Sequence, residues 1–588
     1  MKKITLLMVA LVLTTVAMAQ MSGIYKVGTA EVAPNFSSLS AAVTALNANV
    51  FSADVVLEIT SDITEAANIG LGVDTKGFGV TIRPDADVDR TITFTQLADN
   101  SSPTGHFVIG YPTSGLTVAW SIPNTIATNN VTIDGYAVGG STKRLKITNA
   151  NTTHGSRVLV VVGACQNTTI KNCMIVNSTT NASSPFALGA VVRKVGTAAA
   201  DAELAPNGLI FENNTITCTT STVGMGIRIT NSGTITSAKV SGFVCKNNII
   251  SAQRRILEIN YTNGGEIDGN TISLVQPTST ALGYGVWTSA GCSGTFNIYN
   301  NKFIASSCSG ADVAAGGQRV LSLGGSVTCN VYNNTFAGMN RGGTTAAAVN
   351  QTYCFFGCTG KIYNNTFYMP AVTVNTITGY YTAIQLSYAN PDIKNNIFIS
   401  NEDAMVNAFY SAVTAGVSEN NIFFNRAGKE KSLFVSASTF STFESYQAAN
   451  PTKDVNSKSV DVNFVDAAAG DLRIAGISVQ DANLSVPRLS DVLTDMFGTV
   501  RAANTYAGAH ESTLPFIVTS VDNVEQKALI MRTASGIEVS LDGEASIELY
   551  SINGMMIEKT NANGTYSRDL NKGVYIIRIN GKATKFVK

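Results

Sequence analysis

A four-residue phrase recurs nine times between Cys173 and Asn421, at intervals of 22 to 41 residues. Aligned on its second position, the phrase begins with Cys173 and continues with asparagine at eight positions: Asn214, Asn248, Asn270, Asn301, Asn334, Asn365, Asn396 and Asn421. Repeats of roughly 20 to 50 residues are typical of solenoids, propellers and arrays. The shortest interval, 22 residues, suits one coil of a parallel β-helix, whereas a propeller blade needs about 40.

Apolar residues flank every anchor position. Two residues after the anchor, all nine copies have Ile or Phe, and three residues before it eight of nine are apolar. Each phrase therefore predicts a short strand, a polar corner and a second strand. Stacked copies would bury the apolar columns and align the asparagine amides in a ladder, with layers about 4.8 Å apart. The repeat predicts an all-β fold, a parallel β-helix solenoid.

The column two residues before the anchor is polar and orderly. It reads Lys171, Glu212, Lys246, Asp268, Tyr299, Tyr332, Tyr363, Lys394 and Glu419. Neighbouring strands favour opposite charges and aromatic pairs, so this column is expected to face outward with its members in contact. We expect a structural role for the charges, and the three tyrosines are candidates for sugar binding.

A third strand precedes each phrase. Its alternation predicts inward pairs such as Ile227 with Ile229 and Leu257 with Ile259. The outward set is Arg193, Arg228, Glu258, Trp287, Ser322, Phe355, Gln385 and Tyr410. Three of these, Arg193, Arg228 and Glu258, are candidate catalytic residues. The aromatic members Trp287, Phe355 and Tyr410 are candidate binding residues.

The two ends of the solenoid carry their own signals. Residues 1–19 have two lysines, an apolar run and a small-residue site, which predicts a secretory signal peptide. No later apolar run is long enough for a membrane span. The segment from Ser37 to Asn47 places Leu39, Ala42, Val43 and Leu46 on one helical face. We expect this helix to cap the first coil.

Charge and cysteine content narrow the classes of partner. Lys plus Arg and Asp plus Glu number 40 each, so the sequence gives no basic footprint for nucleic acid. The nine cysteines have no zinc-ligand spacing, and no metal site is expected. They are interpreted as core thiols, with one or two disulfides between coils as the alternative in an exported chain.

The three-strand coils, corner asparagines and capping helix resemble the right-handed parallel β-helix superfamily of pectate lyases and related polysaccharide enzymes. The resemblance covers the range 20–511: cap and irregular first coils (20–150), regular coils (151–430) and closing coils (431–511). Residues 464–511 also resemble the closing coil of secreted β-helix proteins. The matching positions are Asp471, Leu472, Asp495, Gly498, Arg501, Gly508, Ala509 and Glu511.

After a linker at 512–516, residues 517–588 change character. Short strands and Asn553-Gly554, a hairpin signal, predict a small Ig-like β-sandwich. Its phrases SIELYSINGMMIEK and LNKGVYIIRINGKATKFVK resemble the C-terminal sorting domain of type IX secretion cargo. The resemblance implies the type IX machinery as partner and display on the outside of a Gram-negative cell; the alternative is an ordinary accessory module.

Three functions stay open. A glycoside hydrolase needs two close carboxylates, and the third-strand column offers only Glu258. A polysaccharide lyase acting by β-elimination on uronates would use Arg193 and Arg228 to neutralise charge, with Glu258 orienting substrate or holding calcium; otherwise no cofactor is expected. The preferred reading is a secreted, surface-displayed protein that binds glycans or has a structural or adhesive role.

Overall fold

The computed structural model describes residues 20–588 outside a set of short gaps, and residues 1–19, the expected signal peptide, lie outside the described part. The gaps are 96–104, 112–125, 151–156, 181–184, 195–197, 199–200, 222, 276–282, 289–290, 306–317, 325–326, 338–350, 357–358, 371–379, 387–390, 402–405, 412–415, 427–433, 436–439, 441 and 518–527. Contacts divide the chain into two compact units, 1–515 and 516–588.

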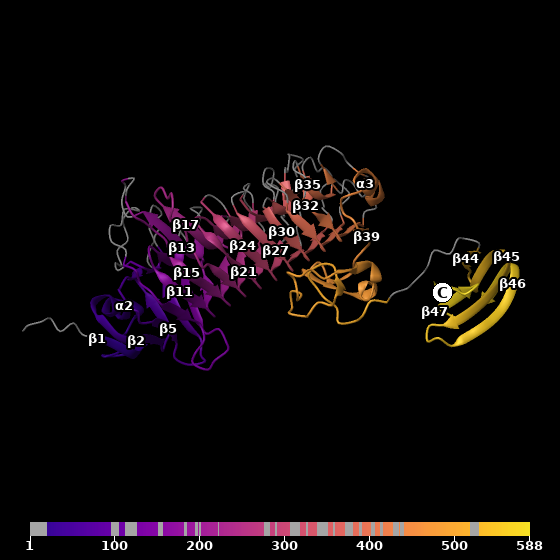
Figure 1. Cartoon of the computed structure of the whole chain (residues 1–588). Helices are drawn as coiled ribbons and strands as arrows, with labels where there is room; N and C mark the ends of the chain where they lie inside the picture. The colour runs from indigo at the N-terminus through magenta and orange to yellow at the C-terminus, as the bar shows by residue number, and fades with distance from the viewer. Residues whose placement is uncertain are drawn as a thin grey trace, which may run out of the picture. The chain divides into compact units, whose positions relative to one another are not determined.

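The first unit is a parallel β-helix, as predicted, with three 13-stranded sheets running along it (Figure 1). Sheet A contains β1 (Gln20–Val27), β2 (Val50–Ile59), β5 (Val80–Pro84), β8 (Val131–Asp134), β11 (Gln166–Lys171), β15 (Asn207–Glu212), β18 (Val244–Lys246), β21 (Asn263–Asp268), β24 (Ser293–Tyr299), β27 (Thr328–Tyr332), β30 (Thr359–Tyr363), β33 (Asp392–Lys394) and β36 (Ser418–Glu419). Sheet B contains β3 (Ile63–Glu65), β6 (Arg90–Phe94), β9 (Leu145–Asn149), β12 (Met174–Val176), β16 (Thr215–Cys218), β19 (Ile249–Ala252), β22 (Thr271–Leu274), β25 (Lys302–Ala305), β28 (Thr335–Ala337), β31 (Thr366–Met369), β34 (Ile397–Ser400), β37 (Ile422–Asn425) and β39 (Lys458–Ser459).

Sheet C carries the third strand of each coil. It contains β4 (Ile69–Leu71), β7 (Phe107–Ile109), β10 (Arg157–Val162), β13 (Phe186–Lys194), β17 (Met225–Ser232), β20 (Arg255–Ile259), β23 (Gly283–Thr288), β26 (Gln318–Ser322), β29 (Gln351–Phe356), β32 (Tyr380–Leu386), β35 (Val406–Ser411) and β38 (Phe434–Val435), with β14 (Glu203–Leu204) antiparallel to β13. The three sheets surround one apolar core.

Asparagines hold the corner between sheets A and B. The Oδ1 of each anchor accepts from the backbone N–H of the preceding anchor: Asn334 Oδ1 lies 2.9 Å from Asn301 N, and Asn365 Oδ1 lies 3.0 Å from Asn334 N. The Nδ2 of Asn334 donates in turn to the carbonyl of Ile298 at 2.8 Å. The same pattern runs from Cys173 N, which donates to Asn214, to Asn396, which donates to Asn421. These buried amides form a continuous ladder.

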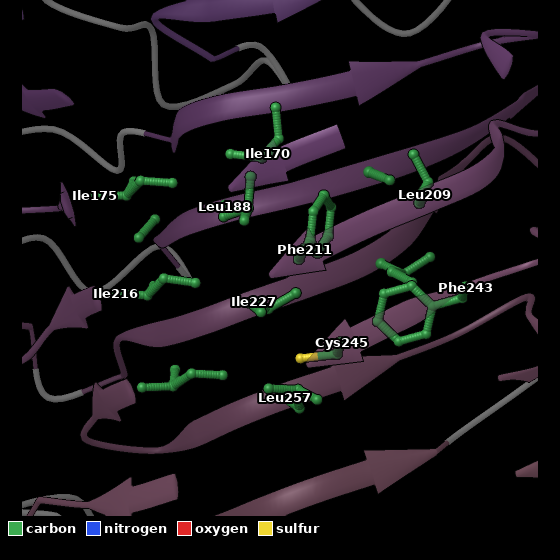
Figure 2. Packing of buried hydrophobic residues seen from close by; sticks show 14 of the residues in the cluster. Ile170, Ile175, Leu188, Leu209, Phe211, Ile216, Ile227, Phe243, Cys245 and Leu257 are labelled. Atoms are coloured by element: carbon green, nitrogen blue, oxygen red, sulfur yellow. The ribbon is translucent and has the colours of Figure 1, made fainter. Parts of the chain in front are cut away.

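Apolar side chains from all three sheets meet inside the coils. In Figure 2, Ile170 and Phe211 of sheet A, Ile216 of sheet B, and Ile227 and Leu257 of sheet C point into a shared interior, and all five are buried. Further along, the column after the anchor becomes a stack of phenylalanines with ring centroids 4.6 to 5.3 Å apart. The stack consists of Phe303, Phe336, Phe367, Phe398 and Phe423.

Two helices close the ends of this core. The predicted cap is α2 (Leu39–Ala48), and it buries Leu39, Ala42, Val43 and Leu46 as expected. Its first turn is bound by Glu65, whose carboxylate accepts from the backbone N–H of Leu39 at 2.7 Å. At the other end, α3 (Phe443–Ala449) places the ring centroid of Phe443 5.6 Å from that of Phe423, the last ring of the stack.

The ladder ends on a buried carboxylate. Asp454 Oδ1 accepts from Asn421 Nδ2 at 3.1 Å and from Ser418 Oγ at 2.8 Å, and Oδ2 accepts from Tyr446 of α3 at 3.0 Å. Asp454 is fully buried. Burial raises the pKa of this carboxyl, although its hydrogen-bond donors act in the opposite direction. The last amide of the ladder is therefore satisfied without another coil.

Residues 464–511, which we call the closing segment, do not add coils to the end. They form two antiparallel pairs, β40 (Phe464–Asp466) with β41 (Asp471–Ile474) and β42 (Ser485–Pro487) with β43 (Asn504–Tyr506). They also contain two short 3-10 helices, η1 (Gly476–Ser478) and η2 (Ala482–Leu484). The closing segment lies along the side of the solenoid (Figure 1). It therefore does not form the closing coils that the sequence predicted for this part of the chain.

A buried arginine fixes the closing segment to the asparagine corner. Arg501 Nη2 donates to Asn333 Oδ1 at 2.9 Å and to the carbonyl of Gly508 at 2.8 Å, and Nη1 lies 3.4 Å from Glu511 Oε2. Gly508 N donates to the carbonyl of Asn395 at 2.7 Å. A Cβ on Gly508 would lie 2.6 Å from Thr366 Oγ1, so glycine is required where this segment approaches the coils.

The cysteines that the structure describes are core thiols. Six are free and buried: Cys165, Cys173, Cys218, Cys245, Cys292 and Cys329. Burial raises the pKa of Cys165, Cys218 and Cys245 to about 12, so these thiols are poor nucleophiles. Cys308 and Cys358, and the side chain of Cys354, lie outside the described residues.

The second unit is a small antiparallel sheet. Its strands are β44 (Ala528–Arg532), β45 (Gly536–Ser551), β46 (Met556–Asp569), β47 (Val574–Ile579) and β48 (Lys582–Val587). The predicted hairpin at Asn553-Gly554 joins β45 to β46. In place of an Ig-like two-sheet sandwich, all five strands belong to one hydrogen-bonded sheet, because the long β45 pairs with β44, β46 and β47.

Candidate functional site

The outer face of sheet C carries an unusual group of charged and aromatic side chains. Register places Arg228 beside Glu258 and Glu258 beside Trp287, on three successive coils. A parallel column contains Arg255 beside Tyr284. Both columns face outward, because the residues between them, such as Leu257, are buried in the core.

One carboxylate lies at the centre of this group. Glu258 Oε2 lies 2.8 Å from Arg255 Nη1 and 3.4 Å from Arg228 Nε, and Oε1 accepts from Asn260 Nδ2 at 3.1 Å. Glu258 is only 2% exposed. Both of its oxygens are engaged, so it is suited to orienting the arginines and poorly suited to removing a proton from a substrate.

Two aromatic rings extend the group by one coil. Tyr284 and Trp287 stack with ring centroids 5.2 Å apart and planes inclined by 20°. Arg255 Cζ lies 4.0 Å from the Trp287 centroid, a cation–π distance. Trp287 is half-buried and Tyr284 is buried. Arg255 therefore connects the carboxylate to the aromatic pair.

Further arginines make the group strongly positive. Burial lowers the pKa of Arg254, and the positive charges of Arg255 and Arg228 lower it further. Burial lowers the pKa of Arg157 as well, again with a contribution from Arg228. We call this set the arginine–tryptophan cluster; it consists of Arg157, Arg228, Arg254, Arg255, Glu258, Tyr284 and Trp287. Three of these guanidinium groups, those of Arg228, Arg254 and Arg255, interact with the one carboxylate of Glu258.

Register separates Arg193 and Phe355 from this cluster. Arg228 pairs with Gly189, whereas Arg193 lies four residues further along β13 and pairs with Ser232. Phe355 pairs with Leu321 in the inward column, and Phe356 occupies the position beside Ser322. The outward set predicted from the sequence is therefore wrong at Phe355, because loops of different length precede each strand. Arg193 does lie on the outer face, as predicted, but four residues away from the row that contains Arg228 and Glu258. Tyr410 does align with Gln385 in the outward column.

The tyrosine column lies on sheet A, on another face of the solenoid. Tyr299 and Tyr332 stack with centroids 4.9 Å apart and planes inclined by 4°. Their ring faces contact each other, so the contacting faces are not available to lie flat against a sugar ring. Tyr363 is buried and donates to Asp392 at 3.4 Å. This geometry favours a structural stack over a sugar platform.

The charges of the same column form ion pairs between coils. Lys246 lies 3.4 Å from Asp268, and Lys394 lies 2.7 Å from Glu419. These pairs give the charges the structural role that their alternation predicted.

Arg157 and Arg254 were missed at the sequence level, because they precede the strands in which alternation was read. A count of arginines near the start of each third strand would have found them.

Comparisons with known proteins leave the function open. No protein-family model matches the chain, and no curated protein is similar to it. Among solved structures, the chain is similar to the crystal structure of DFA-IIIase from Arthrobacter chlorophenolicus A6 without its lid, at 11% identity and a TM-score of 0.36, over 64% of this chain and 84% of that chain. The three parallel sheets of the described chain by themselves define a parallel β-helix protein, and the site has to indicate what it does.

Two further findings bear on partners and cofactors. No helix in the described part of the chain is long and apolar enough to cross a membrane. Within the same residues, no group of three or more His, Cys, Asp and Glu side chains is arranged to hold a metal ion.

Proposed function

We propose that this protein binds an acidic polysaccharide along the outer face of sheet C. The observation that carries the proposal is that three guanidinium groups, those of Arg228, Arg254 and Arg255, interact with the single carboxylate of Glu258. The chain has balanced charge overall, so the local excess reflects placement and not composition. These arginines are half-buried, and a partly desolvated guanidinium group attracts carboxylate or sulfate more strongly than a fully hydrated one, because lower dielectric strengthens charge-assisted hydrogen bonds.

The geometry of the solenoid supports a polymeric ligand. Successive coils repeat the face at the spacing of parallel strands, about 4.8 Å, so an extended chain could contact several coils in turn. Trp287 is half-buried and lies at one side of the arginines, where its exposed part offers an apolar surface for a sugar ring.

Binding of polygalacturonate and of neutral dextran, measured by calorimetry with full-length protein, tests the proposal. We expect polygalacturonate to bind and dextran not to bind. Arg254→Gln should weaken binding about tenfold or more, since a charge-assisted hydrogen bond contributes roughly 1.5–3 kcal/mol. Trp287→Ala should also weaken binding, because it removes the apolar surface for a sugar ring. Lys246→Gln, which removes a positive charge from sheet A, is the matched control and should keep wild-type affinity. Equal binding of dextran, or wild-type affinity in Arg254→Gln, would contradict the proposal.

A lyase is the second candidate, and one observation favours it. The Tyr284 ring lies within 5.9 Å of the Arg255 guanidinium, and a phenol beside cations that neutralise a uronate is a plausible base for β-elimination. The same protein and polygalacturonate serve as the assay, with unsaturated product followed by ultraviolet absorbance. Product that disappears in Tyr284→Phe would support a lyase; binding without product would support a binding protein.

We also propose that the second unit, 516–588, directs export by type IX secretion and display at the cell surface. Its support is the sequence resemblance and its division from the solenoid as a compact unit. Deleting 516–588 should leave the protein inside a type IX-competent host, while the full chain reaches the surface. Surface display of the truncated chain would contradict this part of the proposal.

A further inference from the structure

Arg193 is a buried cation whose hydrogen-bonding groups are mostly unused. It lies near the end of β13 and is only 3% exposed. Its Nη1 and Nη2 atoms have no hydrogen-bond partner among the described residues, and its Nε makes one long contact, 3.4 Å, to the carbonyl of Lys194. Buried charged groups are normally paired, so two free Nη groups at one buried side chain point to a partner that the described part of the polypeptide does not supply.

The acidic residue nearest to Arg193 across β14 is held elsewhere. Glu203 on β14 pairs in register with Lys194, directly beside Arg193. Its carboxylate, however, accepts from the backbone N–H groups of Thr236, Ser237 and Ala238 at 2.7 to 3.0 Å, and from two hydroxyls. These donors lower the pKa of Glu203 strongly. Glu203 thus fixes β14 to residues 236–238, and within the part of the chain that the structure describes it does not serve as a counterion for Arg193.

The surroundings of Arg193 are apolar on one side and polar on the other. Val191, two residues earlier on the same face, packs with Val162 in a small apolar cluster outside the sheet, and Tyr111 packs against this cluster. Tyr111 also interacts electrostatically with Arg193. Ser232 lies beside Arg193 on the next coil. A phenol, a hydroxyl-bearing strand and an apolar wall therefore meet at one guanidinium.

We propose that Arg193 is the centre of a buried site for a small carboxylate. The planar fork of two Nη groups matches a carboxylate in bidentate geometry. The apolar wall of Val162, Val191 and the Tyr111 ring suits the carbon body of an organic acid or a uronic acid residue. One unpaired guanidinium balances one negative charge, which favours a carboxylate over a doubly charged phosphate or sulfate.

This site is separate from the arginine–tryptophan cluster. The residue of β13 that pairs with Arg228 is Gly189, and Arg193 lies four residues beyond it, a distance of about 13 Å along the strand. The inference therefore does not depend on the proposed polysaccharide binding, and variants in one site test it independently of the other.

Thermal unfolding of the full chain with added anions tests the proposal. Acetate and D-galacturonate are the probes, and chloride and sulfate at equal ionic strength are the controls. The carboxylates should raise the unfolding midpoint in a saturable way, as expected for a ligand that binds the folded state, and chloride and sulfate should not. Arg193→Met should abolish this shift, and Arg254→Gln, in the other site, should preserve it.

The same variants provide a second readout. Methionine fills the volume of the arginine stem and removes an unpaired buried charge, so Arg193→Met without ligand should unfold at the same or a higher temperature than wild type. Arg193→Lys keeps the charge but loses the planar fork. This variant should need at least a tenfold higher carboxylate concentration to reach the same shift of the unfolding midpoint. A lower midpoint for Arg193→Met without ligand, equal shifts with sulfate, or carboxylate shifts that persist in Arg193→Met would each overturn the proposal.

Discussion

At the scale of single residues, the two asparagines of each repeated phrase have different structural roles. The first adopts a left-handed backbone, with φ between 51° and 60°, a conformation that asparagine tolerates better than most residues. These residues are Asn172, Asn213, Asn247, Asn300, Asn333, Asn364, Asn395 and Asn420; Gly269, at φ 66°, replaces asparagine in one phrase. The second asparagine makes the ladder. The first turns the chain, and the second satisfies the backbone groups that the turn leaves exposed to the core.

The ladder predicts a large cost for removing one of its amides. Asn334→Ala would leave the Asn301 N–H and the Ile298 carbonyl buried without partners. Each such group costs about 1–3 kcal/mol, so we expect a loss of at least about 2 kcal/mol in unfolding free energy, measured by urea denaturation followed by circular dichroism.

Asn330→Ala on the same coil is the matched control. Asn330 is half-buried on the outer face of sheet A, where it donates to Asn297 at 2.9 Å. Its loss should cost less than about 1 kcal/mol, because water can replace the bond. Similar costs for the two variants would show that the ladder does not contribute more than an ordinary surface hydrogen bond.

At the scale of elements, the ends of the solenoid are closed by parts unlike the coils. Helix α2 covers the first coil, and α3 covers the last phenylalanine of the stack. The ladder ends on Asp454, whose two oxygens accept from Ser418, Asn421, Ser457 and Tyr446. The two helices cover strand edges that a further coil would otherwise cover, and Asp454 accepts a hydrogen bond from an amide that a further coil would otherwise pair.

Asp454 gives the last coil a predictable pH dependence. Because burial raises the pKa of Asp454 above its unfolded value, its contribution to stability is fully present below the unfolded pKa, about 3.9, and is lost as pH rises through the folded pKa. Asp454→Asn keeps the shape without this titration. We therefore expect the urea midpoint of Asp454→Asn, relative to wild type, to increase from about pH 4 to about pH 8. Parallel pH profiles for the two proteins would contradict the assignment.

At the scale of the whole molecule, the chain consists of a long solenoid and a small sheet that fold around separate cores. The solenoid core extends from Met21 to Tyr446, and the second core is formed within residues 530–586. Contacts divide the two units at Pro515. This organisation suits a rigid body that displays a face and a second unit with a different task.

Two separate cores predict independent stability. A chain ending at Pro515 should unfold with the same midpoint as the solenoid transition of the full chain, because no part of the solenoid core is removed. Differential scanning calorimetry of both chains checks this expectation. A lower midpoint in the truncated chain would show that the second unit stabilises the solenoid.

The coils could be predicted from the sequence more accurately than the site. The anchor asparagines could be predicted because they recur at a fixed place in a local phrase. Phe355 was assigned to the wrong face because loops of variable length precede the third strand, and one residue of register moves a side chain to the opposite face. Arg193 was assigned to the correct face but lies four residues from the row of Arg228. The contact of Arg501 with Asn333 joins residues 168 apart in the chain, which no local pattern indicates.

The sequence by itself determined the repeat, the inside and outside of sheets A and B, and the cap that closes the first coil, because all three follow from periodic burial of apolar side chains. Only the tertiary structure decided which arginines share one carboxylate, which guanidinium has no counterion among the described residues, and where the closing segment packs. These depend on the stacking register between coils, and register is set by contacts between residues that are distant in the chain.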